Sequence, residues 1–132
     1  AVTPAGFLAG LRGNILGTVS QVGGVPTGAV IESGSNANGY YIKFANGLQI
    51  TLFTKQTSGA TYNIPAATYY RHTFPSAFSA NPTVSLTVGR SDPDTIVAYG
   101  RTAATSATTV DVSQTHTTYT LFFNIIAIGR WW

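Results

Sequence analysis

Hydrophobic and polar residues follow different patterns before and after residue 28. Residues 1–28 contain glycine at short intervals, which argues against a stable helix, so we expect an extended attachment arm there. At most one helical turn, around Phe7 to Leu11, is compatible with that spacing. From residue 29 onward hydrophobic residues recur at every second position, as in β-strands. The pattern therefore predicts an arm over 1–28 followed by a β-rich domain over 29–132.

The clearest two-residue period surrounds Asn46 and Gly47. Asn-Gly is the preferred pair for a two-residue hairpin turn, because both residues tolerate positive φ. We therefore expect a hairpin whose second strand places Gln49, Thr51 and Phe53 outward. The inward face is expected to carry Tyr40, Ile42, Phe44, Leu48, Ile50 and Leu52.

Further strands follow at regular spacing. In TVSLTV, Val84 and Leu86 alternate with Thr and Ser, which is typical of an antiparallel strand with one wet face. The segment 121–128 is apolar on both faces, so we expect it to be central in a sandwich or to meet another subunit. About six to eight such strands predict an all-β fold, an antiparallel β-sandwich preceded by the N-terminal arm.

Composition restricts the partners of this domain. Charged residues are only 8% of the 132, and the net charge of +3 comes from dispersed basic residues. So little charge predicts a surface that is either rich in hydroxyl groups or buried against other copies of the chain, and we favour burial; nucleic-acid binding would need a basic cluster. No apolar run approaches membrane-spanning length, and there is no cysteine for a disulfide or a thiolate metal site. We expect neither membrane insertion nor a cofactor.

Two segments carry a resemblance to a known family. VPTGAVIESGSNANGYYIKFANGLQIT resembles a linker and hairpin of phage tail-fibre and tail-spike proteins, and FPSAFSANPTVSLTV with the later IIAIGRWW resembles the C-terminal domain of such fibres. The first match rests on Asn38, Gly39, Tyr41, Lys43, Phe44, Ala45 and Gly47. The second rests on Phe74, Pro75, Phe78, Pro82, Val84, Ala127, Gly129 and Trp131. The hairpin departs from the pattern at Asn46, Leu48 and Thr51.

The resemblance has consequences for assembly and location. That fibre domain is similar to the H-type lectins, antiparallel sandwiches that form trimers and bind sugars. The resemblance implies a homotrimer at the tip of a virion tail fibre or spike, outside the cell, joined to other phage tail proteins through residues 1–28. No sugar-binding motif of the lectins maps onto individual residues of this chain.

Catalysis has little support in the sequence. The carboxylates number four, and the two closest, Asp92 and Asp94, flank Pro93 in a turn, where acidic residues commonly cap the backbone. His72 shares a face with Tyr70 and Phe74, so we interpret it as a core or interface residue. No catalytic residue and no metal ligand is assigned, and we expect a protein that is not an enzyme.

Sugar binding needs an aromatic face beside groups that hydrogen-bond hydroxyls. Tyr99 and Arg101 lie two residues apart on one strand and therefore side by side, next to the turn that holds Arg90 and Asp92. A second place is the turn with His116 and Tyr119. Packing or subunit contact is the alternative for each of these six residues, because Tyr and Arg are also enriched in protein interfaces.

The sequence thus favours attachment of a virion to a bacterial surface glycan, without covalent chemistry. The alternative is a purely structural fibre or spike component that bridges other subunits and binds no receptor. A depolymerase would require two carboxylates that face each other across a groove.

Overall fold

The computed structural model describes residues 2–56, 70–90, 100–114 and 121–132. The elements in chain order are α1 (Pro4–Ile15), β1 (Gln21–Val22), β2 (Val25–Pro26), β3 (Ile31–Asn36), β4 (Gly39–Phe44), β5 (Leu48–Gln56), β6 (Tyr70–Thr73), β7 (Thr83–Arg90), β8 (Gly100–Thr105), β9 (Thr109–Gln114) and β10 (Leu121–Arg130).

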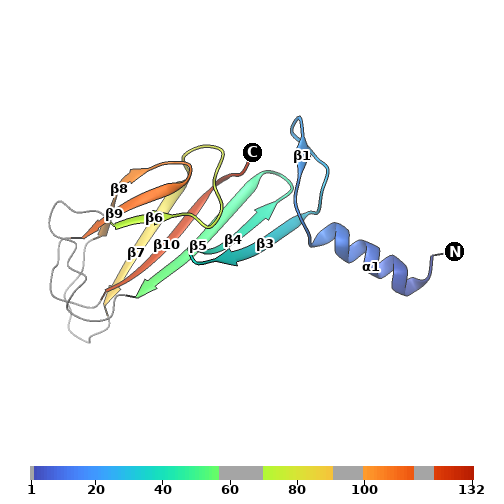
Figure 1. Cartoon of the computed structure of the whole chain (residues 1–132), viewed down its shortest axis with the longest axis horizontal. Coiled ribbons are helices and arrows are strands. Elements are labelled where there is room, and N and C mark those ends of the chain that lie inside the picture. The colour runs from blue at the N-terminus through green and yellow to red at the C-terminus, as the bar shows by residue number, and fades with distance from the viewer. Residues whose placement is uncertain (1, 57–69, 91–99, 115–120) are drawn as a thin grey trace.

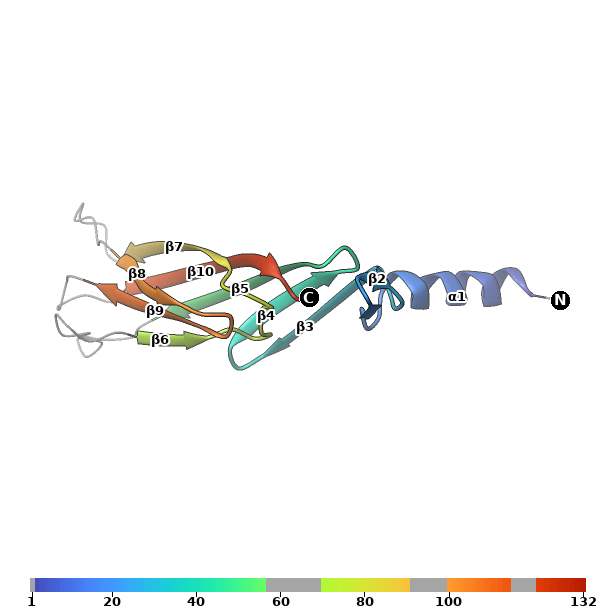
Figure 2. The same cartoon turned by 90° about the horizontal axis from the view of Figure 1, so that it is seen from above.

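The strands form two stacked sheets and a small separate hairpin. The larger sheet has the order β3-β4-β5-β10-β7 and the smaller has the order β6-β9-β8, with antiparallel pairing throughout. Strands β1 and β2 pair only with each other. The smaller sheet lies over β5, β10 and β7, whereas β3 and β4 extend toward the arm (Figures 1 and 2). The predicted all-β antiparallel sandwich is confirmed.

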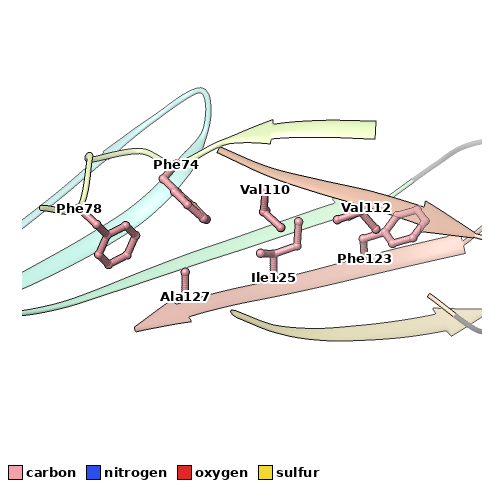
Figure 3. Packing of buried hydrophobic residues seen from close by; sticks show 7 residues of the cluster. All are labelled: Phe74, Phe78, Val110, Val112, Phe123, Ile125 and Ala127. Carbon is pink, nitrogen blue, oxygen red and sulfur yellow. The ribbon is translucent and has the colours of Figure 1, made fainter. Parts of the chain in front are cut away.

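The core fills the space between the two sheets. From β10, Phe123, Ile125 and Ala127 point toward Val110 and Val112 of β9, and all five are buried (Figure 3). Two aromatic rings from the loop after β6 complete the cluster, Phe74 and Phe78, which meet edge to face with centroids 5.1 Å apart. Val84 and Leu86 pack against it from β7, as their alternation predicts.

Strand β10 is central, as expected of a segment that is apolar on both faces. It pairs with β5 on one side and with β7 on the other. The second face of this strand is open to solvent in the described part of the chain, where Ile126 and Ile128 are 38% and 45% exposed.

The faces of β5 are the reverse of the expected ones. Gln49 and Thr51 are buried toward the smaller sheet, and Leu48 and Leu52 lie exposed on the outer face. The physical reason is a hydrogen bond, since the Gln49 amide donates through Nε2 to the carbonyl oxygen of Ser76 at 2.8 Å. The Gln49 amide is itself fully buried and needs a partner there, which the carbonyl of Ser76 provides.

Replacement of Gln49 by alanine is expected to lower the free energy of unfolding by about 2 to 3 kcal/mol. The variant loses the volume of a fully buried side chain and leaves the Ser76 carbonyl without its donor. Urea unfolding at one fixed protein concentration measures the change. Thr83→Ala, at an exposed position of β7, serves as the control, and equal losses in the two variants would contradict the role given to Gln49.

The hairpin at Asn46 and Gly47 is present, but its turn is shifted by one residue. The amide of Gly47 donates to the Phe44 carbonyl at 2.9 Å, which makes Ala45 and Asn46 the central pair. Gly47 follows with φ of 91°, a left-handed conformation that glycine adopts at no steric cost. The expected turn over Asn46 and Gly47 is therefore a turn over Ala45 and Asn46, followed by Gly47 in the left-handed conformation.

The N-terminal segment also differs from expectation, because α1 is a helix of 12 residues. Thr3 caps it, since its Oγ1 accepts a hydrogen bond from the Gly6 amide at 3.1 Å, and Pro4 occupies the first helical position, where a missing N–H costs nothing. The helix extends away from the sheets along the long axis of the molecule (Figure 1). No helix in the described residues has the length and apolar character needed to cross a membrane. The division at residue 28 stays a prediction.

Candidate functional site

Six strand ends meet at the end of the sandwich that lies far from α1 (Figure 2). In the larger sheet, the register places the end of β5 and the end of β7 on either side of the start of β10. In the smaller sheet, the starts of β6 and β8 flank the end of β9. We call this the distal end. Three connections leave from it, 57–69, 91–99 and 115–120.

The residues predicted to bind sugar belong to these connections or border them. Asp92, Tyr99, His116 and Tyr119 lie outside the described residues. Arg90 is the last residue of β7, and Arg101 pairs with Ser113 in the smaller sheet, but the positions of both side chains also lie outside what the structure describes. Their grouping into one site therefore stays a prediction.

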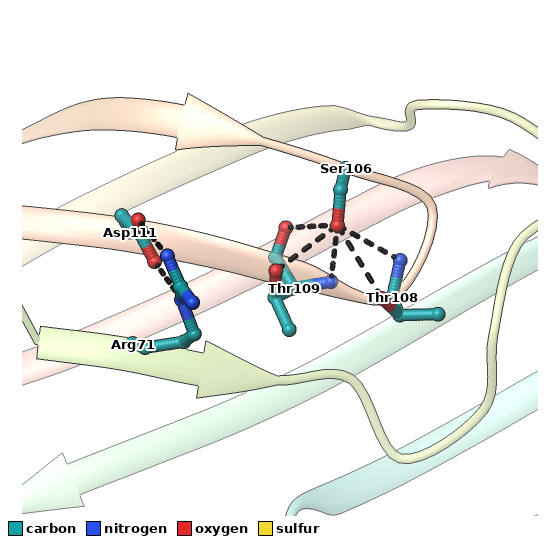
Figure 4. A network of polar contacts seen from close by, with 5 residues as sticks. All are labelled: Arg71, Ser106, Thr108, Thr109 and Asp111. Atoms are coloured by element: carbon teal, nitrogen blue, oxygen red, sulfur yellow. Dashed lines mark hydrogen bonds and ion pairs between the residues drawn. The ribbon is translucent and has the colours of Figure 1, made fainter.

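A described polar pair lies near the distal end, on the outward side of the smaller sheet. Arg71 of β6 donates two hydrogen bonds to Asp111 of β9, Nε to Oδ1 and Nη2 to Oδ2, each of 2.7 Å (Figure 4). The guanidinium lowers the pKa of the Asp111 carboxyl by hydrogen bonding, against a smaller opposing effect of burial, and the carboxylate raises the pKa of Arg71. Both groups are charged at neutral pH.

The pair combines an accessible donor with a buried carboxylate. The Arg71 side chain is 68% exposed, so its remaining N–H groups face solvent, whereas the Asp111 side chain that holds it in place is only 12% exposed. A fixed and exposed guanidinium matches the hydroxyl groups of a sugar. The pair was not found in the sequence, because its two members lie 40 residues apart and meet only through the β6–β9 pairing.

The turn that precedes this part of β9 is held by one hydroxyl. Ser106 Oγ accepts hydrogen bonds from the amides of Thr108 and Thr109, at 3.2 and 3.0 Å (Figure 4). The Ser106 amide in turn donates to the Thr109 carbonyl at 2.8 Å. These bonds fix the start of β9 and thereby the position of Asp111, two residues further on.

His72 is a core residue, as its pattern predicts, and not a ligand. It is 3% exposed, its ring stacks on Phe53 with centroids 4.1 Å apart, and Phe74 meets it edge to face. Burial disfavours the imidazolium and lowers the pKa of His72 to about 4. The imidazole is neutral at physiological pH.

Stability is expected to fall as the pH drops from about 6.5 to about 4. Across this interval the unfolded chain binds a proton at His72 and the folded chain does not, which costs about 3 kcal/mol in total. Asp111, with its lowered pKa, titrates below this window. Denaturant unfolding at several pH values checks the result. His72→Phe removes the titrating group, and an unchanged pH profile in that variant would contradict the assignment.

Glu32 joins the N-terminal segment to the larger sheet. Its carboxylate accepts the Val19 amide at 2.9 Å and the Tyr41 hydroxyl at 3.2 Å, and lies 3.8 Å from Lys43 Nζ. Burial, followed by the hydrogen bond to Glu32, raises the pKa of Tyr41. Trp131 lies beside Lys43 and donates from Nε1 to the Phe44 carbonyl at 2.8 Å. These groups use one another as partners, so we interpret the cluster as structural.

The outer face of the larger sheet is apolar and uncovered. We call the following residues of β4, β5 and β10 the outer apolar face: Tyr40, Ile42, Leu48, Ile50, Leu52, Ile126 and Ile128. A hollow of about 410 Å³ lies in it between β3, β4 and β5, beside Tyr40. Hydroxyl residues border the face along both edge strands, Ser33 and Ser35 on β3 and Thr83 and Ser85 on β7. The arrangement is that of a contact surface with a polar rim.

In the described ranges, no three His, Asp or Glu side chains come together in a group that could hold a metal ion. Glu32 and Asp111 lie in different sheets. The described part of the molecule therefore offers polar and apolar contact surfaces, of which the Arg71–Asp111 pair and the outer apolar face are the most developed.

Comparison with known proteins identifies the fold. No protein-family model matches the chain, and no curated protein sequence matches it. An N-truncated R1-type pyocin tail fibre of known structure is similar with a TM-score of 0.55 and 20% identity, over 98% of each chain.

Two longer fibre structures are also similar. The R1 pyocin fibre of P. aeruginosa has a TM-score of 0.51 and 20% identity over 98% of this chain, and the R2 pyocin fibre has 0.53 and 15% over 77%. The chain spans 32% and 27% of those two chains. At these identities the comparison establishes a shared fold.

Proposed function

We propose that this chain is the receptor-binding part of a tail fibre, which attaches a phage or a phage-tail-like particle to a bacterial surface by non-covalent recognition of a glycan. The observation that carries the proposal is the fold shared with the R1-type pyocin tail fibre over 98% of both chains. A purely structural fibre component would share that fold without binding a receptor, so the glycan is the part that needs a separate test.

The shape of the molecule supports attachment at one end and recognition at the other. α1 and the β1–β2 hairpin lie at one end, where residues 1–28 would join other tail proteins (Figure 2). Four of the six predicted sugar-binding residues belong to the connections that leave the distal end, and Arg90 and Arg101 lie in the strands that border these connections. Near it, the exposed guanidinium of Arg71, held by Asp111, offers hydrogen-bond donors to sugar hydroxyls.

The outer apolar face supports assembly into a homotrimer. A compact monomer of 13.9 kDa has about 6,700 Å² of accessible surface, whereas this chain has 7988 Å², an excess of about 1,300 Å². An interface of standard size buries about 800 Å² on each partner, so the excess exceeds one such contact, whereas each chain of a closed trimer makes two. The seven residues that define the face are uncharged, and Arg130, which pairs with Leu48, lies at its edge at the end of β10. Three weak sugar-binding sites, one on each chain of the trimer, would then give a higher overall affinity than a single site.

Adsorption to cells tests the proposal. Purified chain is mixed with a panel of bacterial strains that includes P. aeruginosa, each beside a derivative that lacks its surface polysaccharide, and the unbound protein is measured. The proposal predicts adsorption to at least one strain and its loss in the polysaccharide-deficient derivative. Equal adsorption to both, or adsorption to none, would contradict it.

Two arginine variants locate the contact. Arg71→Ala is expected to weaken adsorption about tenfold, the loss of one charge-assisted hydrogen-bonding group. Arg130→Ala removes the same charge from the exposed end of β10 that lies farthest from the distal end, beside Leu48 of the outer apolar face, and at a matched oligomeric state it is expected to adsorb like the unmodified chain. Equal losses in both variants would point to a general effect of charge.

A further inference from the structure

Helix α1 carries an apolar stripe that nothing in the described chain covers. At 100° per residue, Phe7, Leu8, Leu11 and Ile15 fall within an arc of about 100° on one side of the helix. All four side chains are exposed, Phe7 at 59% and Leu8 at 55%. Within the stripe the spacing from Leu8 to Leu11 to Ile15 is three and then four residues, the spacing of a coiled-coil seam.

The opposite side of the helix consists of glycine and alanine. Gly6, Gly10 and Gly13 lie there, and a Cβ added at Gly10 or Gly13 would meet no atom within 4 Å. Packing within the chain therefore does not require these two glycines. Each glycine lowers the equilibrium constant for helix formation about fivefold relative to alanine. A helix of 12 residues with three glycines and no tertiary contact along its stripe is not stable by itself in water.

The last turn of the helix is fixed to the larger sheet. The Val30 amide donates to the Asn14 carbonyl and the Gly17 amide to the Ile31 carbonyl, both at 3.0 Å, and Leu16 forms a bridge with Ile31. Ile31 begins β3, which belongs to the sheet that carries the outer apolar face. The direction of α1 is therefore set relative to that face, and both continue along the same axis of the molecule (Figures 1 and 2).

We propose that α1 folds when copies of the chain assemble, and that its apolar stripe is covered by the same helix of the other copies. The stripes of three parallel helices pack against one another in a short bundle that extends from the sandwich. The stripe itself holds no charged residue, and the one charged residue of the helix, Arg12, lies beside the stripe, about 40° from Leu8. This inference rests on the proposed homotrimer and adds to it a segment whose folding is coupled to assembly, with the ordering cost offset by burial of the stripes.

Hydrogen exchange of the backbone amides in α1 tests the inference in the full chain. Exchange is followed by mass spectrometry over a range of protein concentrations, and light scattering reports the number of chains per particle. We expect the amides of the helix to be protected at concentrations where three chains associate. On dilution into the monomer their exchange is expected to become at least about tenfold faster, while the core of β10 stays protected.

Matched aspartate variants separate the stripe from the opposite side. Leu11→Asp places a carboxylate in the stripe, and Ala9→Asp places the same group on the glycine side at a similar cost in helix propensity. Leu11→Asp is expected to lose the protection of α1 and to weaken association about 100-fold, because three carboxylates would meet at the axis of the bundle. Ala9→Asp is expected to keep both. The double variant Gly10→Ala with Gly13→Ala is expected to slow hydrogen exchange of the α1 amides at least about tenfold.

The outcomes distinguish this inference from the proposed function. Rapid exchange of α1 in an intact trimer would overturn the inference, as would equal effects of Leu11→Asp and Ala9→Asp. A chain that stays monomeric at all concentrations and still binds polysaccharide would overturn the inference and leave glycan recognition standing. A trimer with protected helices that binds no polysaccharide would support the inference and overturn the proposed function.

Discussion

Aspartate in place of Ile126 is expected to weaken self-association by at least about 100-fold, because the variant would bury an unpaired carboxylate at the centre of the outer apolar face. Ile126 lies on β10 between Leu52 and Ser85 and is 38% exposed in the single chain. Its side chain points away from the core, so the fold of the individual chain is expected to persist. Analytical ultracentrifugation over a range of concentrations measures the association.

The control adds the same charge to another face. Thr73→Asp lies at an exposed position of β6 in the smaller sheet, and is expected to leave association unchanged. A monomeric Ile126→Asp with native-like circular dichroism would support the outer apolar face as the contact between copies. An Ile126→Asp variant that associates as tightly as Thr73→Asp would exclude that face.

Alanine in place of Phe123 is expected to lower the free energy of unfolding by about 3 to 5 kcal/mol, the usual cost of truncating a buried aromatic side chain. Phe123 is 2% exposed and lies in the core cluster between the two sheets (Figure 3). The cavity would open beside Val112, where sheet pairing on both sides of β10 limits collapse. Guanidinium unfolding at fixed protein concentration is the measurement, since the proposed association would also contribute to stability.

The neighbouring residue of the same strand provides the control. Asn124 is exposed on the outer face, where its Oδ1 accepts a hydrogen bond from Thr54 Oγ1 at 2.9 Å. Asn124→Ala is expected to cost less than about 1 kcal/mol, because exposed hydrogen bonds contribute little. A loss in Phe123→Ala as small as that in Asn124→Ala would contradict the placement of the core.

Two-residue alternation predicted the strands well but not which side of β5 faces the core. Leu48, Ile50 and Leu52 look like inward residues because they are hydrophobic, yet they face the uncovered side. Alternation shows which face of a strand carries the hydrophobic residues, but it does not show whether the chain's own second sheet covers that face. The inner position of Gln49 depends on the Ser76 carbonyl, 27 residues away, which no local pattern indicates.

Glycine content argues against a helix in the N-terminal segment, but the capping residues and the spacing of the apolar residues favour one. Thr3 followed by Pro4 is an N-terminal capping signal, and Leu8, Leu11 and Ile15 have helical spacing. Those local signals were present in the sequence. For the candidate site, alternation correctly placed His72 in the core, but the Arg71–Asp111 pair depends on strand order and could not be read from either segment alone.

Binding of the purified chain to purified surface polysaccharide tests the proposed function most directly. Isothermal titration with the polysaccharide of a strain to which the chain adsorbs measures the affinity, and size-exclusion chromatography of the recovered polysaccharide measures its length. We predict saturable binding and a polysaccharide of unchanged length, as expected for recognition without chemistry. No binding to the purified polysaccharide, or a polysaccharide shortened by the protein, would contradict the account.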